Sequence, residues 1–298
     1  MIPFNYHHLY YFYCVAKEGS ISKAAKTLRL AQPTLSAQLK VFESYLEKSL
    51  FSREGKRLIL TDDGRQVLSY AKTIFDVGQE MIDNLGDRGG RKGSLKIQIG
   101  VSGFIPKTVV DALLRFILET SPETYLTVVE KEPSAMQEDL ETHKLDMILN
   151  DLPYRAAPEE GIENFLLAKL PIVFCASRAI AAKYSKIPKS LHGAPLILPT
   201  AQSQTFHALQ EYFMTQGIQP NVIAEIQDVE VARRLVLSGK GIAPLNEYSA
   251  RHAPLHEKMV VLSPALKIPV HDTIYLTRKK RRNPHPLVSL VLEKFRLS

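Results

Sequence analysis

Long apolar runs and cysteines are scarce in this sequence of 298 residues. No stretch approaches the roughly 20 consecutive apolar residues that a membrane-spanning helix needs. The first residues, MIPFNYHHLYYFY, also lack the basic, apolar and small-residue order of a signal peptide. We therefore expect a cytoplasmic protein that does not associate with a membrane. The two cysteines, Cys14 and Cys175, stand alone among apolar neighbours, so the sequence predicts neither a disulfide framework nor a zinc site.

The sequence motifs of several enzyme classes are absent as well. The stretch Gly100-Val-Ser-Gly103 lacks the third glycine of a dinucleotide-binding fingerprint, and neither a GxSxG nor a P-loop pattern occurs. The nine histidines are scattered, and none has the spacing of a metal-binding motif such as HExxH. We therefore expect no catalysis, no cofactor and no metal ion. An enzyme stays open as an alternative, because an α/β sheet with polar loops could host one.

Positive charge is concentrated at the N-terminal end of a chain whose formal net charge is +7. Residues 1–60 contain nine lysines and arginines against four acidic residues. Such an excess favours a polyanion as the partner of this end, although ordinary solvated surface would also account for it. A second basic run, from Arg278 to Arg282, fits a solvated loop after a strand better than a second DNA-binding site.

Apolar spacing predicts three short helices at the basic end. Apolar residues recur at helical spacing over residues 5–18, where Gly19 ends the pattern. Ser20 can cap a second helix, and Gln32 with Pro33 can open a third, because proline is well tolerated in a first turn. The buried stripe of the third helix is predicted to be Leu35, Leu39, Phe42 and Leu46.

A basic hairpin and a long helix follow the three short helices. Two apolar segments, Leu50-Phe51 and residues 57–60, flank a turn at Gly55, which predicts a hairpin. Thr61 can cap a fourth helix that runs to about Leu85 and carries a long apolar face. No following segment covers that face, so we expect a helix of a second subunit to pack on it.

Three helices followed by a basic hairpin are typical of a winged helix-turn-helix. In such a fold the second helix supports the third, which enters the major groove of DNA. Polar side chains near its start reach base edges, while basic side chains contact phosphates. The alternative is that these side chains are solvated positions on an ordinary helical domain. The predicted DNA-binding residues are Ser20, Ser22, Lys23, Gln32, Pro33, Thr34, Ser36, Ala37, Gln38, Lys40, Arg53, Lys56 and Arg57.

Beyond residue 94 the pattern changes to alternating strands and helices. The predicted elements are strands over residues 95–101, 126–130 and 145–149 with helices over 107–119 and 134–142. This order predicts a mostly parallel sheet with helices on both faces. A second α/β stretch starts near Phe165, and a strand at 273–276 and a helix at 286–295 end the chain. The expected fold class is α/β with an N-terminal all-α winged helix-turn-helix.

The basic end resembles the signature of LysR-type transcriptional regulators. The matching stretches are Ser20-Ile-Ser-Lys-Ala-Ala-Lys-Thr-Leu, Gln32-Pro-Thr-Leu-Ser-Ala-Gln-Leu, Glu43, Leu50-Phe51-Ser-Arg53 and Leu60-Thr61-Asp-Asp-Gly64. The chain length, the long fourth helix and the two-part remainder are also similar to that family. Residues 5–12 and 143–148 look most like the subgroup that activates sodium/proton antiporter expression.

Two positions depart from the family pattern. The family often has arginine where Ala37 stands, so the usual contact to a base or phosphate is in doubt at that position. It usually has glycine where Glu47 stands, and this difference predicts an altered turn into the hairpin.

The resemblance implies that the α/β module senses an effector. It implies two Rossmann-like lobes with the topology of a type 2 periplasmic binding protein and a ligand cleft between them. Polar residues at helix starts in this module suit small anions, although each could also be a capping residue without a ligand. The predicted effector-binding residues are Ser102, Gly103, Ser134, Asn150, Thr200, Gln202, Ser203 and Asn246.

The resemblance also implies a domain layout. The expected parts are a DNA-binding domain at 1–61, a linker helix and hinge at 62–90, and an effector domain at 91–298. Within the effector domain, lobe 1 is expected at about 91–160 and 267–298, and lobe 2 at about 161–266.

The partners implied by the resemblance are double-stranded DNA, further copies of the chain, a small-molecule or ionic effector, and RNA polymerase. The copies would form a dimer, or the tetramer usual in the family, through the linker helix. The expected role is transcriptional activation connected with sodium and pH homeostasis. A plain solute-binding protein is a second alternative, and the basic N-terminal module argues against it.

Overall fold

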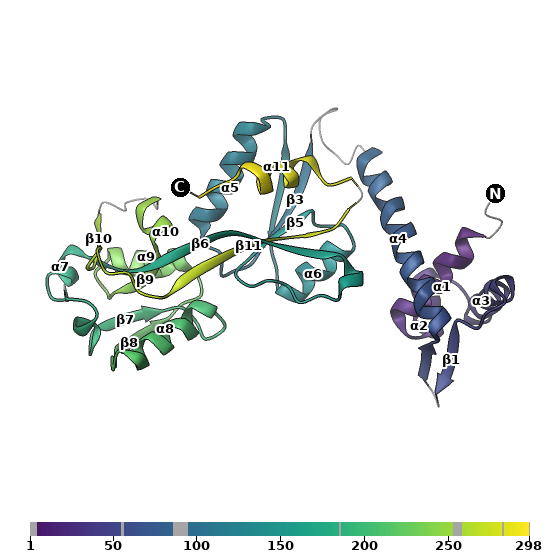
Figure 1. The fold of residues 1–298 in the computed structure, drawn as a ribbon, viewed down its shortest axis with the longest axis horizontal. Coiled ribbons are helices and arrows are strands. Elements are labelled where there is room, and N and C mark those ends of the chain that lie inside the picture. The colour runs from purple at the N-terminus through teal and green to yellow at the C-terminus, as the bar shows by residue number, and fades with distance from the viewer. Residues whose placement is uncertain are drawn as a thin grey trace. The chain divides into compact units, whose positions relative to one another are not determined.

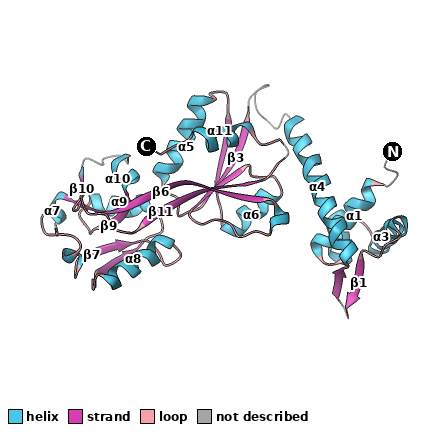
Figure 2. Cartoon of the chain, in the orientation of Figure 1, coloured by secondary structure: helices cyan, strands magenta, loops and turns pink. Residues whose placement is uncertain are grey.

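The computed structural model of this chain describes residues 5–54, 57–85, 95–184, 186–252, 258–281 and 283–297. Backbone contacts divide the chain into two compact units, Met1–Gly86 and Asp87–Ser298, which we call the N-terminal and C-terminal units. Each unit contains a hydrophobic core of its own. Figure 1 labels the helices and strands, and Figure 2 colours them by type.

The N-terminal unit consists of three short helices, a hairpin and a long helix, as predicted. The elements are α1 (Tyr6–Glu18), α2 (Ile21–Leu28), α3 (Gln32–Leu46), β1 (Phe51–Glu54), β2 (Arg57–Leu60) and α4 (Asp62–Leu85). Oδ1 of Asn5 accepts a hydrogen bond from the backbone N–H of His7 at 2.8 Å, so α1 begins one residue later than predicted. The caps predicted at Ser20 and Thr61 are confirmed, because each hydroxyl accepts a hydrogen bond from the backbone N–H three residues later.

One apolar cluster joins the helices and the hairpin of this unit. Leu35, Leu39 and Phe42 of α3 are buried as predicted, whereas Leu46, the last residue of the stripe, is half-buried. The ring of Phe12 on α1 lies 6.0 Å from that of Phe42, centroid to centroid. Because α3 buries this stripe, its opposite side faces outward.

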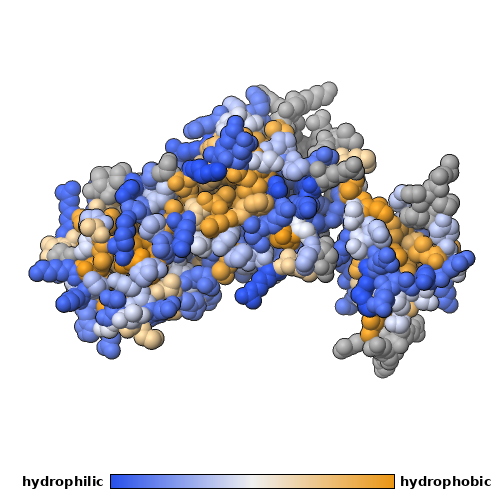
Figure 3. Space-filling model, in the orientation of Figure 1, coloured by the Kyte–Doolittle hydropathy of each residue, from blue (hydrophilic) through white to orange (hydrophobic). Residues whose placement is uncertain are grey.

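Helix α4 carries apolar side chains on two sides. Val67, Ala71 and Phe75 pack into the core of the N-terminal unit. A second set stays exposed, and Figure 3 shows apolar surface along this helix. The exposed set is Tyr70, Ile74, Val77, Met81 and Ile82. Among the described residues, no helix has the length and apolar character needed to cross a membrane.

The turn between α3 and β1 passes through a left-handed residue. Glu47 has φ 54° and ψ 32°, a conformation that glycine adopts at low cost and other residues rarely adopt. The N–H groups of Glu47 and Lys48 donate to the carbonyls of Ser44 and Glu43, which ends α3. The predicted alteration of the turn relative to the family stays a prediction. Glutamate here has a left-handed conformation that glycine also adopts. Because glutamate has a Cβ atom, this conformation costs it more energy than it would cost glycine.

Lobe 1 of the C-terminal unit is a sheet with helices on both faces. Its elements are β3 (Lys96–Val101), α5 (Lys107–Thr120), β4 (Tyr125–Glu130), α6 (Pro133–Glu141), β5 (Met147–Asn150), the first half of β6 (Ile162–Ser177), β11 (His271–Lys279) and α11 (Pro286–Lys294). Leu113 of α5 and Val291 of α11 are buried in one core cluster. Met136 and Leu140 of α6 are buried in another, which Ile148 of β5 joins. The prediction of helices on both faces is confirmed.

The strands of lobe 1 are only partly parallel. β4, β3 and β5 are neighbours and run parallel, as predicted. β11 pairs antiparallel with β5 on one side and with β6 on the other, within the order β10-β6-β11-β5-β3-β4. The prediction of a mostly parallel sheet is confirmed for β3, β4 and β5. β11 is the exception, because it returns directly from the other lobe and not through a crossover helix.

Lobe 2 has a smaller sheet of its own. Its elements are the second half of β6, α7 (Arg178–Ala181), β7 (Pro195–Leu198), α8 (Gln204–Thr215), β8 (Asn221–Glu225), α9 (Val229–Leu237), β9 (Ala243–Asn246), α10 (Glu247–His252) and β10 (Met259–Val261). β7 and β8 are parallel, whereas β9 and β10 pair antiparallel with β6. Short 3-10 helices occur at Pro158–Glu160 and Lys189–Leu191.

Two long adjacent strands, β6 and β11, run from one lobe into the other (Figure 1). Along β6, Leu170 packs against the core of lobe 1 and Ile172 lies in the core of lobe 2. Along the returning chain, Val270 lies in the core of lobe 2 and Ile274 in that of lobe 1. The change of lobe therefore falls between Leu170 and Ile172 on β6 and between Val270 and Ile274 on the returning chain, and the site described below lies at this position.

The basic run near the C-terminus is held in ion pairs. Nε of Arg278, within β11, lies 2.9 Å from Oε2 of Glu163. Arg281 lies 3.2 Å from Asp146, and these two side chains are only 9% and 12% exposed. The prediction of a solvated loop is wrong for Arg278 and Arg281, because β11 extends far enough to bring the run beside acidic residues. Arg282 lies outside the described residues.

Candidate functional site

Helices α2 and α3 are packed closely through small residues. Ala24 and Ala25 of α2 are buried, so no bulky side chain separates the helices. Oγ of Ser22 donates a hydrogen bond to Oε1 of Gln32 at 3.0 Å, which connects the starts of both helices. Arg29, in the left-handed conformation, ends α2 and leads into the turn.

The outward side of α3 carries most of the predicted DNA-binding residues. No acidic residue occurs on α3 before Glu43. Ser22 and Lys23 of α2 are exposed next to it, whereas the hydroxyl of Ser20 is engaged in capping α2. Ala37 has no side chain that could make a hydrogen bond. Gln32, Pro33, Thr34, Ala37 and Lys40 are exposed, and Ser36 and Gln38 are half-buried.

The hairpin is attached to α3 by Glu43. Its Oε1 accepts hydrogen bonds from the backbone N–H groups of Leu50 and Phe51 at 2.7 and 3.2 Å. Sequence reasoning included Glu43 in a motif without giving it this role. The backbones of Arg53 and Arg57 lie in the antiparallel strands β1 and β2.

The predicted effector residues gather where strands of both lobes end. Ser102 follows β3 and Asn150 ends β5, and both are buried in lobe 1. With Gln202 of lobe 2 they line a pocket of about 570 Å³. A pocket of about 50 Å³, lined by Ser203 and Asn246 of lobe 2, shares several lining residues with the larger one. We call the two pockets together the interlobe cleft.

Three predicted effector residues do not line the interlobe cleft. Gly103 lies at its wall, because a Cβ atom there would come within 2.8 Å of Nε2 of Gln227, a lining residue from lobe 2. Ser134 is exposed in the first turn of α6. Thr200 has a buried hydroxyl without a hydrogen-bond partner in the loop after β7. Lys56, predicted to contact DNA, lies outside the described residues.

Sequence reasoning missed two acidic residues in the interlobe cleft. Asp272 lies at the start of β11, where Oδ1 accepts a hydrogen bond from Thr205 at 2.5 Å and Oδ2 one from Asn246 at 2.9 Å. Asp151 follows β5, and its Oδ1 accepts a hydrogen bond from Ser102 at 3.4 Å. The one available signal was position, since Asp151 directly follows the predicted residue Asn150 and Asp272 adjoins the predicted strand at 273–276.

Both carboxyl groups titrate at higher pH than usual. Burial raises the pKa of Asp272, against the lowering effect of the hydrogen bonds from Thr205 and Asn246. Burial also raises the pKa of Asp151, and the nearby charge of Asp272 adds to the effect. Tyr154, another lining residue, has its pKa raised to about 12 by burial and by the charge of Asp151. The cleft therefore disfavours negative charge on its own side chains.

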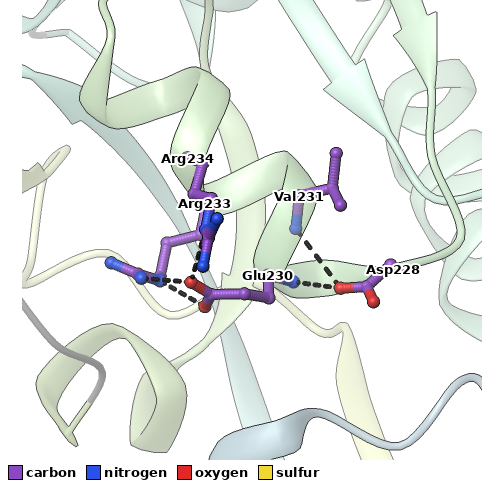
Figure 4. Close-up of polar contacts among 5 residues, drawn as sticks. All are labelled: Asp228, Glu230, Val231, Arg233 and Arg234. Carbon is purple, nitrogen blue, oxygen red and sulfur yellow. Dashed lines mark hydrogen bonds and ion pairs between the residues drawn. The ribbon is translucent and has the colours of Figure 1, made fainter.

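A second groove, of about 340 Å³, lies between α5, α9 and α10. Oγ1 of Thr108 on α5 and Oγ of Ser249 on α10 lie 2.6 Å apart, which connects the two lobes. Figure 4 shows Glu230 on α9 in contact with both Arg233 and Arg234. The hydrogen bond from Arg233 is the largest cause that lowers the pKa of Glu230. The charges of Glu230, Arg233 and Arg234 are therefore paired with one another within the chain.

A third groove is lined by none of the predicted effector residues, and the described residues form no cluster that could hold a metal ion. A groove of about 770 Å³ on lobe 1 is lined by residues of β6, β11 and α11, and none of the predicted effector residues lines it. In the described part of the chain, no three His, Cys, Asp or Glu side chains are grouped so that they could hold a metal ion.

Comparisons with known proteins agree in covering both units. The family model of the LysR substrate binding domain matches residues 89–296. The model described as bacterial regulatory helix-turn-helix protein, lysR family, matches residues 6–65. Transcriptional activator protein NhaR of Escherichia coli is 30% identical over 78% of this chain and 76% of its own length. The transcriptional activator CmpR of Synechocystis sp. is 31% identical over 86% of this chain and 83% of its own.

Solved structures show the same fold. Full-length CbnR, crystallised with its target DNA, covers 97% of both chains with a TM-score of 0.53 at 21% identity. HinK, a LysR family regulator from Pseudomonas aeruginosa, covers 97% of this chain and 96% of its own with a TM-score of 0.54 at 18% identity. The expected fold class, with its helix-turn-helix and two-lobed α/β module, is confirmed. The chain belongs to the LysR family of DNA-binding transcription regulators.

Proposed function

We propose that this regulator binds DNA through α3 and the hairpin and activates transcription when a small effector occupies the interlobe cleft. The observation that carries the proposal is the pocket of about 570 Å³ lined by Ser102 and Asn150 of lobe 1 and by Gln202 of lobe 2. A ligand held by both lobes can favour one lobe arrangement over another. Activation is proposed because the relatives NhaR and CmpR are named as activators.

The DNA-binding half of the proposal rests on the exposed side of α3. Gln32 and Thr34 lie in its first turn, where side chains would reach base edges, and exposed Lys40 on the same helix would contact phosphate. We further propose that exposed α4 residues pair the chain with a second copy, so that two heads read a two-fold-related site. The protein would act in the cytoplasm, with RNA polymerase as a further partner.

Fluorescence anisotropy with the upstream DNA of its own gene tests DNA binding. We expect selective binding that weakens steeply with salt, because lysines and arginines displace counterions from phosphates. Lys40→Ala is expected to weaken binding and to reduce the slope of log K against log salt by about 1. Lys183→Ala, the same change at an exposed position of the C-terminal unit, serves as the matched control. Equal binding to an unrelated duplex at every salt concentration would contradict sequence-specific recognition.

A reporter assay tests the cleft. Gln202→Lys places a long charged side chain in the pocket, and we expect it to abolish the response to inducing conditions while leaving DNA affinity unchanged. Gln210→Lys makes the same change on exposed α8, outside the cleft, and should respond normally. A normal response by the Gln202 variant would remove the cleft from the mechanism.

The resemblance to regulators of sodium/proton antiporter expression extends the proposal to sodium and pH homeostasis. Deletion of the gene is expected to impair growth at high sodium concentration and alkaline pH. Growth equal to that of the parent strain would remove this extension and leave the DNA-binding and cleft proposals standing.

A further inference from the structure

The two carboxyl groups of the interlobe cleft differ from three other enclosed acidic residues of the C-terminal unit. Asp139 lies 2.6 Å from Lys131, Asp146 lies 3.2 Å from Arg281, and Glu230 lies 2.5 Å from Arg233. Among the described residues, neither Asp151 nor Asp272 has a lysine, arginine or histidine nitrogen within ion-pair distance. In the described part of the chain, these three carboxylates are balanced by a cation, and the two in the cleft are not.

The pKa directions follow this difference. Hydrogen bonds from cationic neighbours lower the pKa of Asp139 and of Glu230. Burial raises the pKa of Asp151 and Asp272, because their hydrogen-bond donors are neutral hydroxyl and amide groups that do not balance the charge. An ionised carboxylate in such surroundings is stabilised by any positive group that enters the cleft.

The other charged residues that line the cleft leave the net charge of its lining negative. Glu132 and Arg155 are exposed at the edge of the larger pocket and offset each other, and His271 lines the smaller pocket. The lining therefore contains three carboxyl groups against one arginine. An anionic effector would have to approach Asp151, which lines both pockets.

The size of the cleft indicates what kind of positive group fits. A volume of about 570 Å³ lies within the range of sites for small organic molecules and far exceeds that of one bare metal ion. Phe104, shared by both pockets, and Tyr154 supply aromatic surface for a carbon skeleton.

We propose that the effector is a small organic cation whose ammonium or guanidinium group lies against Asp151 and Asp272. This inference rests on the proposed function, because it names the ligand class of the same cleft. It replaces the expectation of a small anion, which considered helix starts and not the two aspartates. Asp151 lines both pockets and Asp272 lines the smaller one, so a positive group in the smaller pocket lies against both while the carbon skeleton occupies the larger pocket.

Proton competition follows from this arrangement. The carboxyl groups must be ionised to pair with the ligand, so affinity is expected to rise with pH through their elevated pKa values. Glu132, Tyr154, Arg155 and His271 are the other titratable groups that line the cleft, and Asp151→Asn separates their contribution from that of the aspartate.

Calorimetric titration of the purified full-length protein with three probes of equal chain length tests the proposal. The probes are the four-carbon diamine putrescine, the four-carbon diol butanediol and the four-carbon dicarboxylate succinate, at constant ionic strength set by potassium chloride. We expect putrescine to bind most tightly and more tightly at higher pH. Asp151→Asn and Asp272→Asn should each weaken it by about tenfold or more, while Asp62→Asn, an exposed change in the N-terminal unit, should not.

Four outcomes overturn the proposal. The first two are tighter binding of succinate than of putrescine and no binding of putrescine at any pH. The other two are unchanged putrescine affinity in both aspartate variants, and binding of the sodium ion, supplied as sodium chloride, without binding of the diamine. Circular dichroism of each variant establishes that it is folded. If the ligand class fails while Gln202→Lys still abolishes the response in cells, the cleft remains the sensor and only its ligand is reassigned. If Gln202→Lys responds normally, the proposed function itself fails.

Discussion

At the scale of single residues, the backbone conformation of Glu47 lowers the stability of the fold. Its φ of 54° is unfavourable for a residue with a Cβ atom, and its exposed side chain has no hydrogen bond or ion pair among the described residues. We expect Glu47→Gly to raise the free energy of unfolding by about 1 kcal/mol. Urea denaturation of the full chain, followed by circular dichroism, measures the change.

A second glycine variant controls for the effect of glycine itself. Ser44 is exposed in the interior of α3, where φ is helical. Ser44→Gly is expected to lower the free energy of unfolding by roughly 0.5 kcal/mol, because glycine loses more conformational entropy in a helix. If both variants lose stability equally, the left-handed turn at Glu47 is not the source of the cost.

Asp272 leads to a prediction about pH. A carboxyl group whose pKa is higher in the folded chain than in the unfolded chain stabilises the fold below its unfolded pKa, and this stability is lost as pH rises through its folded pKa. We therefore expect the melting temperature of Asp272→Asn, relative to that of the wild type, to increase as pH rises from about 4. The amide keeps both contacts, since its oxygen accepts from Asn246 and its nitrogen donates to Thr205.

Thermal melts of both proteins over a series of pH values measure this gain. Asp111→Asn, an exposed change on α5, controls for the loss of one negative charge. A melting-temperature difference that stays constant across the series would show that the folded chain does not perturb the titration of Asp272.

At the scale of helices and strands, the N-terminal unit could be predicted closely because its signals are local. Caps at Ser20 and Thr61 and the buried stripe of α3 depend on residues three or four apart, which the sequence displays directly. The direction of β11 could not be predicted in this way. It depends on β6 and β11 pairing across about one hundred residues, and no local spacing records such a pairing.

The candidate site shows the same division between local and distant information. Ser102, Asn150 and Gln202 could be selected because each follows a predicted strand, and the carboxyl ends of strands in such folds gather at one place. Asp151 and Asp272 could not be recognised as a pair, because they are far apart in sequence. Asp272 becomes part of the cleft only where the chain changes lobe.

Helix α4 supports a prediction about self-association. Val77 and Met81 are exposed one turn apart on a face that the N-terminal unit does not cover. If a second copy packs there, Val77→Glu is expected to weaken self-association by at least about tenfold, because a carboxylate would be buried without a partner. Ser69→Glu, on another side of the same helix, is the matched control and should leave association unchanged.

Sedimentation equilibrium of the wild type and both variants measures the association constant. Equal weakening by the two substitutions would point to general charge repulsion. No weakening by Val77→Glu would mean that the subunits associate elsewhere.

At the scale of the whole C-terminal unit, the two lobes are joined by two strands and by contacts of α10, whose Tyr248 packs against the core of lobe 1. The strands β6 and β11 cross between the cores, and Thr108 of α5 reaches Ser249 of α10. Ser249 is also tied to the cleft, because its backbone N–H donates to Oδ1 of Asn246 at 2.7 Å, and Asn246 donates to Asp272. This series of hydrogen bonds links the cleft to the contact between α5 and α10.

A double-mutant cycle on Thr108 and Ser249 is expected to reveal that link. Thr108→Val and Ser249→Ala should each lower the free energy of unfolding, and the double variant should lose less than the sum of both by about 0.5 to 1.5 kcal/mol. Cleft residues should also exchange amide hydrogens faster in the double variant, because it lacks a hydrogen bond that joins the lobes. Additive losses with unchanged exchange at the cleft would mean that the two hydroxyls are neighbours without coupling. In that case the crossing strands β6 and β11 and the packing of Tyr248 on lobe 1, and not the two hydroxyls, would determine how the lobes move when an effector binds.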